Sequence, residues 1–342
     1  MAEHEPGVAV VACVRDEELN LENAVRSALG QDYSGELDVV LAVGPSHDRT
    51  REIADKLAAE HPQVHVVDNP TGSRSIGLNL AFAAAPADRE IIVRVDGHTA
   101  FEPDYVQRGV AALLESGAVG VGGLMSPAGR TPTQSAVARA MSHPVGLGQA
   151  SFHVGGEAGP AETVYLGIFR RNAVDAVGGY DPTIFRAEDW ELCLRLRRAG
   201  GMLWFEPSLV VTYWPRRTFK AVAKQFWRTG MWRREVVRRE PTTASLRYLA
   251  PPAALLALGV SVPTIAVGVA TGSAGILLAG LAAPMAYSAV VLAGTAHAAL
   301  RRPRLSLRSA LLVAPVVVTM HMAWGAGFLR GLTARAAVDH RA

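Results

Sequence analysis

Three long apolar stretches near the carboxyl end constrain this chain more than any other feature. None of them contains Asp, Glu, Lys or Arg, and each is close to the ~20 residues that an α-helix needs to cross a bilayer. Prolines interrupt all three, which membrane helices tolerate. We therefore expect a membrane region, 246–342, with about three helices at 249–270, 275–299 and 309–329.

The charges around these stretches indicate an orientation. Residues 301–308 hold four arginines, whereas residues 271–274 carry no charge. Because cytoplasmic loops are enriched in Lys and Arg, we expect a multi-pass protein of the cell membrane whose preceding domain is cytoplasmic. The tail carries further arginines, at 330, 335 and 341, which fits poorly with a third crossing. Whether the last stretch spans fully, turns back or lies partly in the interface stays open.

A basic and aromatic segment, 215–245, precedes the first apolar stretch. Its Lys and Arg residues are interleaved with Phe219, Phe226, Trp227 and Trp232, which is typical of a helix at the lipid headgroups. A basic helix that packs on a catalytic domain and binds phosphates is an alternative that does not exclude the first. Membrane lipid is thus an expected partner, whereas the net charge of only +3 argues against nucleic acid.

The part before this segment, 1–214, predicts an α/β domain. Short apolar runs have the length and composition of buried strands, and the residues between them follow helical spacing. The runs lie at 8–14, 37–43, 64–67 and 91–95, and the helical patterns at 21–29, 53–58 and 75–85. Strands that alternate with helices predict a mostly parallel sheet with flanking helices.

Polar residues end the fourth of these runs. The sequence Ile91–His98 passes from a buried strand directly into Asp96, Gly97 and His98. In open α/β sheets, ligands bind just outside the carboxyl ends of the strands. A carboxylate and an imidazole two residues apart can share one divalent cation, provided that the glycine lets the backbone bend. A metal site against a diphosphate and a plain turn are both compatible with this motif alone.

The first strand is followed by Asp16 and Glu17, where a phosphate-binding loop would carry glycines. Neither Gly-x-Gly-x-x-Gly nor Gly-x-x-x-x-Gly-Lys-Ser/Thr follows this strand. Their absence argues against a dinucleotide oxidoreductase, a P-loop enzyme and a nucleotidyltransferase with a glycine- and lysine-bearing loop. Acids at this edge instead suit the donor groups of a base or ribose.

Glu188 and Asp189 open a predicted helix, with Trp190 on its buried side. One of the two carboxylates can serve as a general base. Alternatively, both only cap the helix and complement its dipole, and spacing alone favours this second interpretation. Neighbouring helical positions point about 100° apart, so we do not expect both side chains to face the same atom.

Taken together, these residues resemble the inverting family 2 glycosyltransferases, which have a GT-A fold. The resemblance covers residues 8–232, and the chain is most similar to membrane-anchored members that build exopolysaccharide repeat units on a lipid carrier, the succinoglycan type. The motifs that carry it are Cys13–Glu17, Ser46–Thr50, Leu78–Asn79, Asp96–His98, Gly178–Asp181, Glu188–Leu192 and Gln225–Arg228.

The resemblance implies a nucleotide-diphosphate sugar donor, a divalent cation (Mn²⁺ or Mg²⁺) and a lipid-linked saccharide acceptor. It assigns the cation to Asp96 and His98, the general base to Asp189, and to Glu188 a role in orienting the acceptor or its loop. The implied donor-binding residues are Arg15, Asp16, Glu17, Asp48, Asn79 and Asp96. The implied acceptor-side residues are Gly178, Gly179, Tyr180, Asp181 and Trp190, and those at a phosphate or at the interface are Gln225 and Arg228.

The chain departs from the family pattern in three places. Val43 and Gly44 stand where the family has an acidic pair that helps to read the nucleobase, and Asp16 replaces the usual Asn. The last motif lacks its final Trp, which favours addition of a single sugar over processive synthesis. The missing acids support an alternative function, a catalytically inactive, membrane-tethered module that binds a sugar or nucleotide. The retained metal pair and carboxylate pair argue for the enzyme.

Overall fold

The computed structural model describes residues 5–148, 150–184 and 187–331. Arg335 and Arg341 of the tail lie outside these ranges. The chain divides into two compact units, Met1–Ser126 with Gly155–Tyr213, and Pro127–Val154 with Trp214–Ala342. The range 1–214, expected as one domain, is therefore interrupted by a segment that clusters with the second unit.

An eight-stranded sheet forms the first unit, with the order β3-β2-β1-β4-β7-β5-β8-β6. Its parallel half consists of β1 (Val8–Val14), β2 (Leu37–Val43), β3 (Val64–Asp68) and β4 (Ile91–Val95). Val8 lies in register with Leu37 on one side and with Ile91 on the other. Because β1 and β4 are covered on both faces, they read as continuous apolar runs, as strands of parallel sheets do.

The other half of the sheet is mixed. Strand β7 (Ile168–Arg170) is antiparallel to both β4 and β5 (Gly120–Pro127), and β6 (Gly159–Ala161) is antiparallel to β8 (Leu203–Tyr213). The expected mostly parallel sheet is confirmed. Strand β8 was not predicted from the sequence; its buried residues alternate with partly or fully exposed ones along much of its length.

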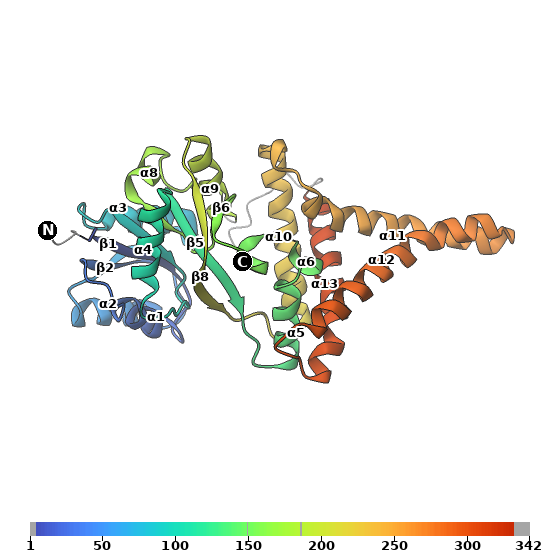
Figure 1. Ribbon diagram of the computed structural model, residues 1–342, viewed down its shortest axis with the longest axis horizontal. Coiled ribbons are helices and arrows are strands. Elements are labelled where there is room, and N and C mark those ends of the chain that lie inside the picture. Colours follow the sequence, from blue (N-terminus) through green and yellow to red (C-terminus); the bar gives the residue numbers. More distant parts are fainter. Residues whose placement is uncertain (1–4, 149, 185–186, 332–342) are drawn as a thin grey trace. The chain divides into compact units, whose positions relative to one another are not determined.

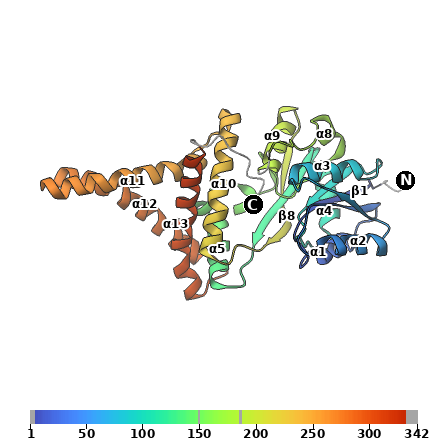
Figure 2. The ribbon, with the colours of Figure 1, turned by 180° about the vertical axis from the view of Figure 1, so that it is seen from behind.

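Helices cover both faces of this sheet (Figures 1 and 2). The helices α1 (Leu21–Leu29), α2 (Thr50–Glu60) and α4 (Tyr105–Ser116) contribute to one apolar cluster. The helices α3 (Arg74–Ala84), α8 (Arg171–Ala176) and α9 (Glu188–Arg198) contribute to a second cluster. This two-layer cover leaves the carboxyl ends of β1, β2 and β4 to the loops that carry the site.

The second unit is helical. It consists of α5 (Pro132–Met141), α6 (Pro144–Leu147), α7 (Ser151–Val154), α10 (Phe219–Arg239), the 3₁₀ turn η1 (Pro241–Thr243), α11 (Leu246–Thr271), α12 (Ala274–Leu300) and α13 (Leu307–Arg330). In the described part of the chain, three helical stretches are long and apolar enough to cross a membrane: Tyr248–Thr271, Ala274–Leu300 and Leu307–Arg330. The expectation of three apolar carboxyl-terminal helices is confirmed.

Candidate active site

The candidate active site centres on a buried arginine in β4. Arg94 is 2% exposed, and its guanidinium lies 3.1 Å from the Asp96 carboxylate, 3.7 Å from Glu188 and 3.5 Å from Asp189. Glu188 and Asp189 begin α9, so one guanidinium joins the end of a central strand to the start of a helix far away in the sequence. The two carboxylates contact different nitrogens of Arg94, Nη2 and Nη1.

A second arginine, Arg74 at the start of α3, approaches the same carboxylates. Its Nη1 lies 3.8 Å from Asp96 Oδ1 and 3.5 Å from Glu188 Oε1. Three carboxylates thus share two guanidinium groups, which offset all but one of their negative charges when all three are ionised. A buried charge is tolerated only when it is paired in this way.

This arrangement of charges gives the carboxyl groups of Asp96 and Asp189 very different pKa values. Burial alone would raise the pKa of Asp96, but Arg94, Arg74 and His98 outweigh it and lower the pKa to about 2. Burial raises the pKa of Asp189 to about 6 against the pull of Arg94, and Glu188 and Asp96 add to the rise. Asp96 is therefore a permanent anion near neutral pH, whereas Asp189 can exchange a proton there. Two carboxylates with pKa values pushed apart are typical of an active site.

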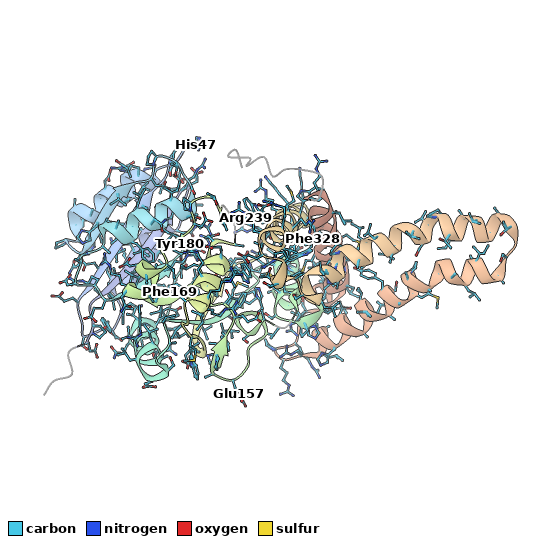
Figure 3. The ribbon with its side chains drawn as sticks, turned by 90° about the horizontal axis from the view of Figure 1, so that it is seen from above. His47, Glu157, Phe169, Tyr180, Arg239 and Phe328 are labelled. Atoms are coloured by element: carbon cyan, nitrogen blue, oxygen red, sulfur yellow. The ribbon has the colours of Figure 1, made fainter. Side chains whose placement is uncertain are left out.

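The start of α9 is held by a glycine turn. The Tyr180 hydroxyl donates to Asp189 Oδ1 at 3.3 Å, and Figure 3 shows Tyr180 within the first unit. Asn79 on α3 donates to the Tyr180 carbonyl at 2.7 Å and accepts from its N–H at 2.8 Å. Gly179 has φ +69°, and a Cβ there would lie 2.6 Å from Asn79 Oδ1. In this structure, therefore, the Asn79 amide positions the Gly178–Asp181 turn.

The loops after β1 and β2 are joined by side chain to backbone hydrogen bonds. Asp16, at φ +55°, accepts from the N–H of His47, whose exposed side chain lies at the edge of the first unit in Figure 3. Asp48 accepts from the N–H of Thr50 with one oxygen and from the N–H of Glu18 with the other, both at 3.0 Å. The loops of Arg15, Asp16, Glu17 and Asp48 thus meet at one sheet edge, with Asp48 occupied by their mutual contacts.

His98 and Glu17 form a hydrogen-bonded pair beside Asp96. The Nδ1–H of His98 donates to Glu17 at 2.8 Å, which leaves Nε2 as the nitrogen that can bind a cation. This hydrogen bond is also the main cause that raises the pKa of His98. A Cβ on Gly97 would come within 2.9 Å of Val14 and 3.1 Å of Glu17, so only glycine fits between the two candidate ligands.

An Asp and a His whose other nitrogen is held by a carboxylate fit a divalent cation. Over residues 5–148, 150–184 and 187–331, no group of three or more His, Cys, Asp or Glu side chains is arranged to hold a metal ion by itself. A cation at Asp96 and His98 would therefore need further ligands from a substrate.

Of the remaining predicted residues, two lie near the start of α9 and two lie in the second unit. Asp181 accepts from the N–H and hydroxyl of Thr183, which closes the turn before α9, and Trp190 is half-buried on α9. Gln225 and Arg228 lie on α10, in the second unit.

Neither arginine of the cluster, Arg74 or Arg94, was predicted from the sequence as a site residue. The only signal for Arg94 was a charged residue within an otherwise apolar strand, and a lone buried charge requires a partner. Arg74 carried no comparable signal, because its exposed position at the start of a helix is ordinary for arginine.

Comparison with known proteins decides the family. The family described as "Glycosyltransferase like family 2" matches residues 6–231. The chain is a member of glycosyltransferase family 2. The succinoglycan biosynthesis protein ExoA of Rhizobium meliloti is 32% identical over 301 residues, which cover 86% of this chain and 85% of that protein.

Two further relatives are more distant. A dolichyl N-acetyl-alpha-D-glucosaminyl phosphate 3-beta-D-2,3-diacetamido-2,3-dideoxy-beta-D-glucuronosyltransferase of Methanococcus voltae is 22% identical over 227 residues, 64% of this chain and 70% of that enzyme. The mannosyltransferase PcManGT of Pyrobaculum calidifontis, solved with GDP-Man and Mn²⁺, shares the fold with a TM-score of 0.60 and 18% identity, over 97% of this chain and 88% of that one. The predicted GT-A fold and glycosyltransferase activity are thereby confirmed.

Proposed function

We propose that this glycosyltransferase transfers a single sugar from a nucleotide-diphosphate sugar to a lipid-linked saccharide, with inversion, in exopolysaccharide or cell-envelope synthesis. The observation that carries the proposal is the pair of unlike carboxylates around Arg94. Asp96 stays ionised at the strand end, and Asp189 has a pKa of about 6 at the start of α9. The names of two relatives support this class of acceptor and product: one is a succinoglycan biosynthesis protein, and the other is a glucuronosyltransferase named for a dolichyl N-acetyl-glucosaminyl phosphate.

The donor is expected at the carboxyl edge of β1, β2 and β4. The loops of Arg15 to Glu17 and of Asp48 would hold the nucleoside, while Asp96 and His98 would hold a divalent cation. When bound, that cation would supply positive charge that stabilises the leaving diphosphate. The Mn²⁺ in the PcManGT structure supports this role, and an imidazole ligand favours Mn²⁺ over Mg²⁺.

Asp189 is proposed as the general base. A base must be ionised to accept the proton of the acceptor hydroxyl, and bases whose pKa lies near the working pH are the most effective. Arg94 holds Asp189 on one side at 3.5 Å and the Tyr180 hydroxyl holds it at 3.3 Å, so the carboxylate is oriented before the acceptor arrives. Glu188 is 5% exposed and paired with both arginines, which suits an orienting role better than proton transfer.

A lipid-linked acceptor is supported by features of the second unit. Its described residues line a half-open pocket of about 500 Å³, formed mostly by apolar residues of α6, α11, α12 and α13. Arg216, Arg217 and the basic residues of α10 precede these helices, and we propose that they contact the cytoplasmic leaflet and that the catalytic domain is cytoplasmic.

The substitution Asp189→Asn tests the proposal. It keeps the size of the side chain and much of its capping ability but removes the base, so we expect transfer to fall by ~10²–10⁴-fold. Folding and donor affinity should stay nearly unchanged. Glu191→Gln is the matched control: it removes another acid from the first turn of α9, but Glu191 pairs with Arg195 at 2.6 Å, away from the cluster.

Three outcomes would contradict the assignment. Equal losses in both variants would indicate that the acids act only through the helix. A product that keeps the anomeric configuration of the donor would rule out inversion. Purified wild-type protein that binds but neither hydrolyses nor transfers from any nucleotide sugar would favour the inactive binding module.

A further inference from the structure

The backbones of α10 and α13 are in close contact. A Cβ added to Gly230 would lie 2.2 Å from the Trp324 carbonyl oxygen, and one added to Gly327 would lie 2.0 Å from the Trp227 carbonyl oxygen. Farther along both helices, Gly331 faces the Arg234 side chain at 3.0 Å. The contacts advance in the same direction on the two helices, so α10 and α13 run parallel with a fixed register.

This register determines which charged residues of α10 lie beside α13. If the same pairing continues toward the amino ends of both helices, the exposed Lys220 and Lys224 lie alongside the middle of α13, and Arg228 follows one turn later. If α13 crossed a bilayer, these cations would lie near the hydrocarbon centre, where a charge is costly. A helix as charged as α10 is expected at the membrane–water interface, and α13 packs against it and so should lie there too.

The surface of α13 also differs from that of α11 and α12. In their most apolar windows, 39% of α13 is buried within the protein, compared with 11% of each of the other two. Leu307, Leu311 and Val318 of α13 are exposed along one side, whereas Val313 and Val317 are fully buried. An apolar stripe on one side of a helix is typical of a helix that lies in the interface.

The directions of the helices agree with this difference. In Figures 1 and 2, α10 and α13 lie side by side, while α11 and α12 form a hairpin that extends away across their direction. Figure 3, seen from above, shows the same hairpin extending sideways. If the hairpin follows the membrane normal, α10 and α13 lie in the membrane plane.

We propose that α11 and α12 alone cross the bilayer, and that α10 and α13 lie together along its cytoplasmic surface. The stripe of Leu307, Leu311 and Val318 enters the hydrocarbon, and the cations of α10 bind anionic headgroups. The arginine-rich segment 301–308, which leads into the first turn of α13, and Arg330 at the end of α13 are then on the same side, as the positive-inside rule favours. This topology goes beyond the proposed reaction and stands or falls without it.

Single-cysteine labelling in the full-length protein tests the topology. The positions are Thr271→Cys at the tip of the hairpin, Arg308→Cys in the first turn of α13 and Arg330→Cys at its end, all exposed. A membrane-impermeant maleimide should label the first in intact cells and the other two only after permeabilisation. The wild-type chain, with the partly buried Cys13 and the buried Cys193, measures the background.

Labelling of Arg330→Cys but not Arg308→Cys in intact cells would show that α13 crosses, and would overturn the proposal. Labelling of Thr271→Cys only after permeabilisation would overturn it as well, since the hairpin would not cross. An alkaline phosphatase fused after residue 342 gives an independent measurement: it should be inactive, and an active fusion would contradict the two-crossing topology.

Discussion

Replacement of Arg94 by methionine tests the electrostatic basis of the site. The substitution keeps a long side chain in the buried position but removes the charge that faces Asp96, Glu188 and Asp189 at 3.1–3.7 Å. Removing one partner of a buried ion pair costs about 3–5 kcal/mol of unfolding free energy. Arg74 remains beside two of the carboxylates, so we expect a loss of about 3 kcal/mol, or roughly 6–12 °C in Tm for a domain of this size.

The loss should depend on pH. In the variant, the pKa of Asp189 rises farther above its unfolded value, so the folded protein takes up protons as the pH falls from 7.5 to 5. A carboxyl group with a raised folded-state pKa destabilises the folded protein fully above that pKa, and this penalty fades as the pH falls from the folded-state pKa toward the lower unfolded-state pKa. The Tm difference from wild type should therefore be largest at pH 7.5 and should shrink clearly at pH 5.

The pH dependence of kcat should show the same rise in the pKa of Asp189. Two unit charges 3.5 Å apart, the distance from Arg94 to Asp189, interact by about 5 kcal/mol at an effective dielectric constant of ~20. An interaction of that size corresponds to about 3.5 pKa units, and Arg74 and solvent reduce the expected shift to about one unit or more. Since the base must be ionised, the ascending limb of kcat against pH should lie near pH 6 in the wild type and at least about one unit higher in the variant.

Arg170→Met is the control, because the Arg170 guanidinium donates to the carbonyls of Ala118 and Leu113. Its loss should cost stability to a similar extent at pH 5 and pH 7.5 and should leave the ascending limb in place. If Arg94→Met lost the same Tm at both pH values, or if its ascending limb coincided with that of wild type, the assignment of Arg94 as the counter-ion of the base would be wrong.

Two further predictions concern the metal and the glycine turn. His98→Ala should abolish Mn²⁺-dependent donor binding. Glu17→Gln should weaken this binding, since the Glu17 carboxylate orients the imidazole of His98. Excess chelator should stop transfer by the wild-type protein, and full activity in chelator would refute the metal site. Gly179→Ala should lower the Tm and the rate of transfer more than Gly178→Ala does, when both properties are measured for each purified variant. Both glycines have a positive φ, but only a Cβ at position 179 would come within 2.6 Å of Asn79. Equal effects of the two substitutions would refute the steric argument.

The parallel half of the sheet could be predicted because its chemistry is local. The apolar runs of β1, β2 and β4 are buried along almost their whole length and end at polar turns, so composition and length suffice. Strand β8 could not be predicted in this way, since many of its residues are exposed and its burial depends on β6 from an earlier part of the chain.

The candidate site was predictable only in part. Asp96 and His98 could be inferred from their position at a strand end, and Asp189 from a resemblance to a family. The carboxylates of α9 were expected to point apart, yet both reach Arg94, because its guanidinium offers a separate nitrogen to each. No local pattern connects Arg94 with α9, because their contact depends on how the helix packs on the sheet.

The interruption of the first unit by Pro127–Val154 has a consequence for the order in which the chain folds during synthesis. Strand β8 completes the sheet as soon as Tyr213 has emerged. Helix α5, whose Ala136 and Val137 are buried, packs against α12 and α13, which are made last. Synthesis proceeds at roughly 5–20 residues per second. The side of α5 that becomes buried therefore stays exposed for on the order of tens of seconds, until α13 has been made. Its exposure ends only when α12 and α13 have been made and pack against it.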